Sequence, residues 1–138
     1  MNNLFEKILI SIGSIISIGF GIWHFFVPRI WNWYSYIKPE ATELILAVRA
    51  INIFFSLVLV LFGLMNIFLI FGNGISKYSL LIVLVATCIL WMSRVLMQII
   101  YPQGSINPII KYGMLCVFII VLICYLFTLI LVLKRKYG

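Results

Sequence analysis

Four long apolar segments run along the chain, separated by three short connections with polar, aromatic, glycine and proline residues. The apolar segments cover residues of about 8–26, 44–71, 79–100 and 113–133. Each has roughly the twenty residues that an α-helix needs to cross about 30 Å of hydrocarbon. The segments are continuous and do not alternate at every second residue, which argues against a β-barrel. We therefore predict an all-α fold, an integral membrane four-helix bundle, with residues 1–138 forming a single transmembrane domain.

Composition supports this prediction and limits the partners. Of the 138 residues, 65% are hydrophobic and 9% are charged, whereas a soluble domain is about half apolar and a quarter charged. The lipid bilayer is therefore the predicted solvent. The net charge of +7 raises the question of nucleic-acid binding. The basic residues are scattered and form no stripe on a polar surface, so we exclude nucleic acid and expect contact with anionic lipid headgroups.

The basic residues also predict an orientation. With four spans, both termini lie on one side of the membrane. Five bases fall on that side, namely Lys7, Lys77, Lys134, Arg135 and Lys136. Three fall on the opposite side, namely Arg29, Lys38 and Lys111. The positive-inside rule then predicts a multi-pass protein of the cell membrane with both its N- and C-termini in the cytoplasm.

Polar and small residues recur at helical spacing in three of the four segments, so each of these helices has one polar face. In the first segment they are Ser14, Ser17, Gly21, His24 and Pro28; in the second, Arg49, Asn52, Ser56, Gly63 and Asn66; in the third, Thr87, Trp91, Arg94, Gln98 and Tyr101. Polar groups are expensive in hydrocarbon, so these faces should turn toward the bundle interior. The fourth segment offers only Tyr125 and Thr128, which predicts a packing and lipid-facing helix.

Helix direction brings part of these faces to one depth in the membrane. Odd and even helices run oppositely, so the end of the first helix, the start of the second and the end of the third lie on one side. The predicted ligand-binding residues at that depth are His24, Arg49, Asn52, Arg94, Gln98 and Tyr101. Two guanidinium groups in one interior repel each other unless an anion such as a carboxylate or phosphate binds between them. The alternative is that the arginines snorkel to the headgroups or form purely structural pairs.

Motifs for catalysis, metals and cofactors are not found. His24 is the only histidine, so a single chain cannot supply bis-histidine haem ligation or a histidine-rich metal site. Cys88, Cys116 and Cys124 form no Cys-x-x-Cys pair and are expected to pack as small hydrophobic residues. There is no glycine-rich phosphate loop and no pair of intramembrane carboxylates. We therefore expect no metal or cofactor bound by the chain alone, and the pattern favours a non-enzymatic protein.

Two segments resemble a known group of proteins. Gly21-x-x-His24-Phe25-x-x-Pro28 is similar to a segment of uncharacterised small bacterial four-helix membrane proteins that are loosely DoxX-like. The series Trp91-x-x-Arg94-x-x-x-Gln98-x-x-Tyr101 resembles a third-helix pattern in one such group. The resemblance implies a four-helix bundle of the bacterial inner membrane with the histidine and the arginine near one face. Some DoxX-like proteins are associated with quinone-linked sulfur or redox complexes, which implies an architecture here and leaves the activity open.

Three functions fit these patterns. The leading hypothesis is a non-enzymatic bundle whose polar, basic cavity in the outer leaflet binds an anionic small molecule or lipid, with a transport or accessory role. The second is a DoxX-like membrane subunit of a quinone-linked redox complex, which would need a quinone or a partner. The third is a structural or immunity-type protein that acts through helix contacts with a membrane protein partner or as a homo-oligomer.

Overall fold

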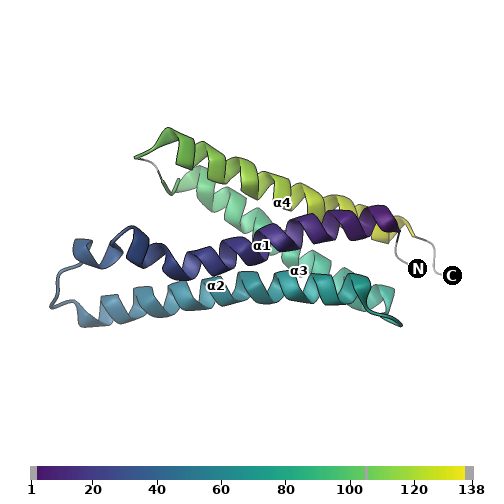
Figure 1. Ribbon diagram of the computed structural model, residues 1–138, viewed down its shortest axis with the longest axis horizontal. Helices are drawn as coiled ribbons and strands as arrows, with labels where there is room; N and C mark the ends of the chain where they lie inside the picture. Colours follow the sequence, from purple (N-terminus) through teal and green to yellow (C-terminus); the bar gives the residue numbers. More distant parts are fainter. Residues whose placement is uncertain (1–2, 105, 136–138) are drawn as a thin grey trace.

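The computed structural model describes residues 3–104 and 106–135. Its elements are, in order, α1 (Leu4–Ile30), the 3-10 helix η1 (Trp33–Tyr36), α2 (Thr42–Phe71), α3 (Lys77–Ile100) and α4 (Pro108–Lys134) (Figure 1). The described residues contain no strand, and all four α-helices are long and apolar enough to cross a membrane. The predicted fold class is confirmed: the protein is an all-α, multi-pass membrane protein built as a four-helix bundle.

All four helices extend beyond the apolar segments that predict them, and the extensions at the end of α1 and the start of α4 involve proline. Helix α1 continues past Pro28 to Ile30, because a proline close to the end of a helix removes only one of the last backbone hydrogen bonds. Helix α4 begins at Pro108, ahead of its apolar segment. Proline suits a first helical position because the N–H there has no partner in the helix. The Asn107 side chain accepts a hydrogen bond from Ile109 N at 2.9 Å and caps this start.

Helices α1 and α2 cross at short distance, where glycine residues of each helix face the other. A Cβ atom placed on Gly21 would lie 2.8 Å from the carbonyl oxygen of Ser56. A Cβ atom on Gly63 would lie 2.6 Å from the side chain of Ile18. The hydroxyl of Ser17 donates to the carbonyl oxygen of Leu59 at 3.0 Å. Because Gly21 and Gly63 have no side chain, the two backbones can approach closely, and these contacts fix how α2 is placed against α1.

The polar faces of α1, α2 and α3 turn inward, as predicted. The buried members are Ser14, Ser17, Gly21, His24 and Pro28 of α1, Asn52, Ser56, Gly63 and Asn66 of α2, and Thr87, Trp91, Arg94 and Gln98 of α3. Arg49 and Tyr101 are exceptions, since both are exposed. Inside the bundle, Asn66 Nδ2 donates to Thr87 Oγ1 at 2.8 Å. The interior is thus held partly by interhelical hydrogen bonds, while apolar side chains face outward.

Helix α4 packs mainly through apolar side chains, with one polar partner among them. Tyr125 is fully buried, and its hydroxyl lies 3.0 Å from the hydroxyl of Ser14 on α1. Thr128 only donates to the carbonyl oxygen of Cys124 in its own helix, at 2.8 Å. The sequence pattern therefore predicts the general character of α4, and the structure adds a hydrogen bond from one of its side chains, Tyr125, to another helix.

The end of the bundle that holds the termini is tied together. Buried Glu6 of α1 forms an ion pair with Arg135, directly after α4. The Lys77 ammonium at the start of α3 donates to the carbonyl oxygen of Arg135 and, at 3.4 Å, to that of Leu133. Lys136, counted among the bases of this side, lies outside the described residues.

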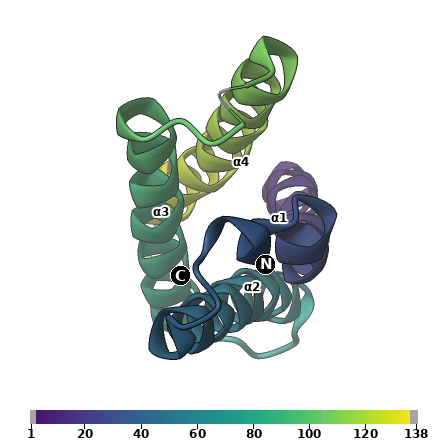
Figure 2. The same cartoon turned by 90° about the vertical axis from the view of Figure 1, so that its left-hand side faces the viewer.

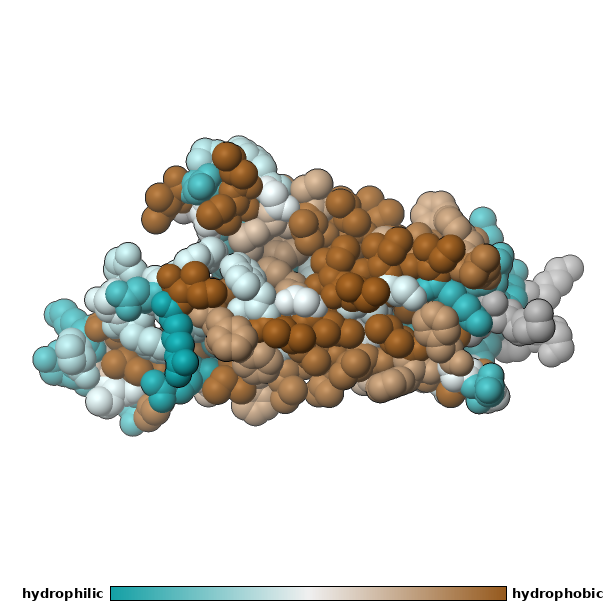
Figure 3. All heavy atoms as spheres, viewed as in Figure 1, coloured by the Kyte–Doolittle hydropathy of each residue, from teal (hydrophilic) through white to brown (hydrophobic). Residues whose placement is uncertain are grey.

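At the opposite end, the α1–η1–α2 hairpin and the α3–α4 hairpin diverge (Figures 1 and 2). The space-filling view shows a broad apolar band between hydrophilic ends (Figure 3). The same view shows a hollow between the lobe of η1 and the lobe of the α3–α4 connection. The bundle is therefore closed at one end and divided at the other.

Candidate functional site

Arg94 lies at the base of the divided end and is surrounded by aromatic rings. It is a buried residue of α3, with 8% of its surface exposed. Its guanidinium carbon lies 4.4 Å from the ring centre of Phe118, 5.8 Å from Phe55 and 5.9 Å from Phe20. These rings come from α4, α2 and α1, so each of the other three helices contributes one. Aromatic faces attract a cation and here replace part of its lost hydration.

The polar partner of Arg94 comes from the connection after α3. Arg94 Nη2 donates to Gln103 Oε1 at 2.7 Å. Gln98, one helical turn beyond Arg94, fixes Gln103: its Nε2 donates to the Gln103 carbonyl oxygen at 3.0 Å and to that of Lys111 at 3.4 Å. Gln103 N donates in return to Gln98 Oε1 at 3.4 Å. Gln98 therefore positions the neutral side chain that binds the guanidinium. In the described part of the chain, no carboxylate forms an ion pair with Arg94.

His24 stands beside Arg94 in an aromatic setting. Its ring centre lies 4.7 Å from that of Phe55, 5.6 Å from Phe20 and 6.2 Å from Trp33. The buried Nδ1 atom of His24 has no hydrogen-bond partner within the described structure. A buried polar atom without a partner is uncommon in proteins and identifies this ring as a candidate for contact with a ligand.

Asn52 replaces a backbone hydrogen bond that α1 lacks. Pro28 has no N–H, so the carbonyl oxygen of His24, four residues earlier, loses its helical partner. Asn52 Nδ2 donates to that oxygen at 3.1 Å. A side chain of α2 thus replaces the missing bond of α1 at the depth of the site. The Asn52 side chain also lies within reach of the His24 imidazole, although neither Asn52 Oδ1 nor His24 Nδ1 makes a hydrogen bond of good geometry in the described structure.

These side chains line a pocket of about 350 Å³. Its lining residues are His24, Trp33, Ile51, Asn52, Phe55, Arg94, Met97, Tyr101 and Gln103. The rim residues Ile51 of α2 and Met97 of α3 are 68% and 53% exposed. Both are apolar and belong to the outer surface of the candidate spans, so the pocket borders the apolar surface between α2 and α3. We call it the Arg94 pocket.

The structure brings most, but not all, of the predicted ligand-binding residues together. His24, Asn52, Arg94 and Tyr101 line the Arg94 pocket, and Tyr101 stands at its rim with 69% of its surface exposed. Gln98 is buried behind the pocket and acts on it through Gln103.

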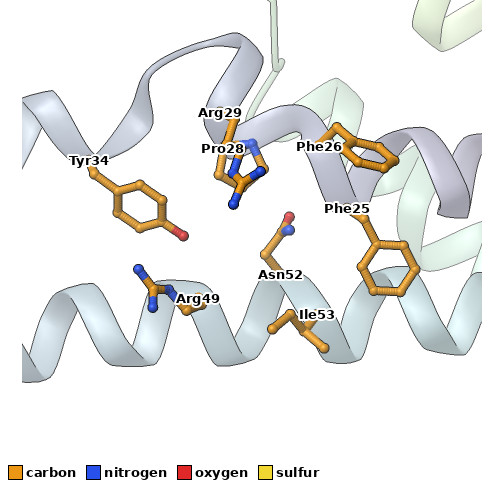
Figure 4. A pocket seen from close by; sticks show the side chains of 8 residues that line it. All are labelled: Phe25, Phe26, Pro28, Arg29, Tyr34, Arg49, Asn52 and Ile53. Atoms are coloured by element: carbon orange, nitrogen blue, oxygen red, sulfur yellow. The ribbon is translucent and has the colours of Figure 1, made fainter.

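Arg49 lies elsewhere, which corrects the expectation that the two arginines share one cavity. It lines a neighbouring pocket between α1 and α2, and its guanidinium carbon lies 5.6 Å from the ring centre of Tyr34 (Figure 4). The reason is that Arg49 is placed opposite the η1 segment, whereas Arg94 points into the bundle among the phenylalanines.

The sequence does not predict the partners of Arg94, namely Gln103, Phe20, Phe55 and Phe118. It also does not predict the lining residues Trp33, Ile51 and Met97. Gln103 lies in a connection, where no helical periodicity applies. The phenylalanines belong to apolar segments in which any position can face lipid or the interior. Among the described residues there is no cluster of three or more His, Cys, Asp or Glu side chains placed to hold a metal ion.

Comparisons with known proteins add no identity to this geometry. The loose likeness to DoxX-like proteins rests on the quoted segments of α1 and α3 and stays a hypothesis. Searches against protein-family models, curated proteins and solved structures gave no match.

Proposed function

We propose that this protein is a non-enzymatic membrane protein that binds an anionic amphiphile in the Arg94 pocket, in a transport or accessory role. The observation that carries the proposal is the burial of Arg94 without a carboxylate partner in the described structure. A buried charge is costly unless it is paired, and the rings and one amide offset only part of that cost. A guanidinium also has five N–H donors, and Arg94 Nε is buried without a partner. A carboxylate or phosphate oxygen from a ligand would satisfy both the charge and the donors.

The rest of the pocket supports an amphiphile over a small polar ion. Beyond the polar base of Arg94, His24 and Gln103, its walls are largely apolar and aromatic. The apolar rim between α2 and α3 is accessible from the hydrocarbon, so a molecule dissolved in the membrane can reach the guanidinium without crossing the headgroups. With cytoplasmic termini, as the basic residues favour, the pocket lies in the outer leaflet.

The test uses oleate and methyl oleate, two probes with the same chain that differ in charge. We expect the purified protein in maltoside micelles to bind oleate and to bind methyl oleate at least about 10-fold more weakly. Arg94→Gln should lower oleate affinity by about 10-fold or more, because a charged hydrogen bond is lost. Arg94→Lys retains the charge but cannot donate two parallel hydrogen bonds from one planar group. Its oleate affinity should therefore fall between those of the unmodified protein and Arg94→Gln. Lys38→Gln is the matched control, since Lys38 is an exposed base outside the pocket. Equal binding by Arg94→Gln and Lys38→Gln would contradict the proposal.

A quinone is the second candidate ligand, favoured by one observation. The unpartnered Nδ1 of His24 and the donors of Arg94 line the same pocket between aromatic walls, an arrangement that can bind carbonyl oxygens. Binding of a short-chain ubiquinone that depends on Arg94, without binding of oleate, would support the redox-subunit hypothesis. Binding of neither probe would favour a protein that acts only through helix contacts.

A further inference from the structure

A second pocket, of about 430 Å³, lies between α1 and α2 (Figure 4). Its lining residues are Phe25, Phe26, Pro28, Arg29, Tyr34, Arg49, Asn52 and Ile53. Asn52 also lines the Arg94 pocket, so the two pockets meet at this side chain. We call this space the Arg29–Arg49 pocket.

Two guanidinium groups line this pocket from opposite helices. Arg29 lies in the last turn of α1, and Arg49 lies on α2. Neither forms an ion pair within the described part of the chain, where the one salt bridge joins Glu6 to Arg135 at the far end. No carboxylate lines the pocket, and the Tyr34 hydroxyl points into the space between the helices (Figure 4). Two unpaired guanidinium groups facing one space favour an anion with several oxygens, because each planar fork can donate two parallel hydrogen bonds.

The pocket is polarised along the helices. The arginines and Tyr34 lie at the end nearer η1, and Phe25, Phe26 and Ile53 lie on the side toward the middle of the helices (Figure 4). All three of these apolar side chains are exposed, at 37%, 54% and 47%. Arg49 is about 10 Å along α2 from its start at Thr42, counted at 1.5 Å per residue. Charged groups near the helix ends, followed by apolar groups toward the centre, match the order of headgroup and acyl chain in one leaflet of a membrane.

A third observation concerns the kind of headgroup. Asn52 lines this pocket, and its buried Oδ1 atom makes no hydrogen bond of good geometry in the described structure, although its side chain lies within reach of the His24 imidazole. An amide oxygen accepts hydrogen bonds, so it suits a hydroxyl group next to the phosphate. A trimethylammonium group offers no O–H donor and is repelled by the two guanidinium groups.

We propose that the Arg29–Arg49 pocket binds the phosphodiester of an anionic, hydroxyl-bearing phospholipid, with an acyl chain lying along Phe25, Phe26 and Ile53. Arg29 and Arg49 bind the phosphate oxygens, Tyr34 donates to one of them, and Asn52 accepts from a headgroup hydroxyl. The proposal does not depend on the ligand of the Arg94 pocket, since the two sites use different arginines.

The experiment is native mass spectrometry of the purified protein titrated with phosphatidylglycerol, phosphatidylcholine or inorganic phosphate. We expect phosphatidylglycerol to bind at least about 10-fold more tightly than phosphatidylcholine. The double variant Arg29→Gln/Arg49→Gln should lose this preference, and Arg29→Lys/Arg49→Lys, which retains both charges without the forks, should keep only part of it. Lys38→Gln should bind as the unmodified protein does, because this exposed base does not line the pocket.

Three results would overturn the proposal. The first is equal preference for phosphatidylglycerol in the double glutamine variant and in Lys38→Gln. The second is binding of inorganic phosphate as tight as that of phosphatidylglycerol, which would mean that the apolar side contributes nothing. The third is loss of phosphatidylglycerol on Arg94→Gln but not on the double variant. Failure of the Arg94 proposal is separately visible, because its probe is oleate and its critical variant is Arg94→Gln.

Discussion

The contact between α1 and α2 can be tested with two alanine substitutions in the same helix. Gly21 faces α2, and a Cβ atom there would lie 2.8 Å from Ser56 O, 2.9 Å from Val60 Cγ2 and 3.0 Å from Leu59 Cβ. A Cβ atom on Gly19 has nothing within 4 Å. Gly21→Ala and Gly19→Ala therefore make the same chemical change on opposite faces of α1.

The quantity to predict is the difference between the free energies of unfolding of the two variants. Both substitutions gain up to about 1 kcal/mol of helix propensity, a term that cancels in the difference. For Gly21→Ala, the nearest atom is a backbone oxygen that cannot rotate away, so α1 and α2 must separate by roughly 0.5 Å. Such overpacking costs about 1–3 kcal/mol. We therefore expect Gly21→Ala to be less stable than Gly19→Ala by about 1–3 kcal/mol, with Gly19→Ala at or above the stability of the unmodified protein.

The assay is reversible unfolding in mixed micelles with an increasing mole fraction of dodecyl sulfate, followed by tryptophan fluorescence. Equal free energies of unfolding for the two variants, within about 0.5 kcal/mol, would refute the close crossing of α1 and α2. So would a variant pair in which Gly19→Ala is the less stable member.

Further predictions concern single contacts. Asn52→Leu should lower the free energy of unfolding by about 1–2 kcal/mol, because the His24 carbonyl oxygen loses its hydrogen-bond partner. This loss should be smaller in a Pro28→Ala background, where residue 28 supplies a backbone N–H to that oxygen. A double-mutant cycle measures the coupling between the two positions. Tyr125→Phe should cost about 0.5–1.5 kcal/mol because it breaks the hydrogen bond to α1, whereas Thr128→Val should change the same free energy by less than about 0.5 kcal/mol, since that hydroxyl bonds only within α4. Single cysteines placed near either terminus should be protected from an impermeant thiol reagent added outside the cell, and labelling there would reverse the proposed orientation.

The sequence predicts the helices well because a bilayer imposes a simple requirement on them. Some twenty consecutive apolar residues form a spanning helix almost regardless of what surrounds them. The inward faces were also readable, since polar side chains such as Asn66 and Thr87 have few alternatives to an interior partner in lipid. The sequence predicts the helix ends less accurately, because Pro28 and Pro108 interrupt the apolar pattern although α1 continues past Pro28 and α4 already begins at Pro108.

The separation of the two arginines could not be read from periodicity. Arg49 and Arg94 both lie on the polar faces of their helices and at similar depth. Their surroundings depend on how the hairpins cross and on where η1 folds back, which places Tyr34 beside Arg49. The cage around Arg94 depends equally on Phe118, one of many apolar residues in a helix with no polar stripe. Such contacts are set by tertiary packing, and the chain carries no local signal for them.

Polar contacts join the helices at the end of the bundle that holds both termini, so small rotations there produce larger displacements at the opposite end. Glu6, Lys77 and Arg135 join three helices at one end, while the hairpins are separate at the other (Figure 1). Helix α1 has 27 residues and is thus about 40 Å long. A rotation of one hairpin by about 5° around the tied end moves the far end by about 3.5 Å over that length. The separation of the two hairpins at the open end is therefore more sensitive to such a rotation than any contact near the tied end.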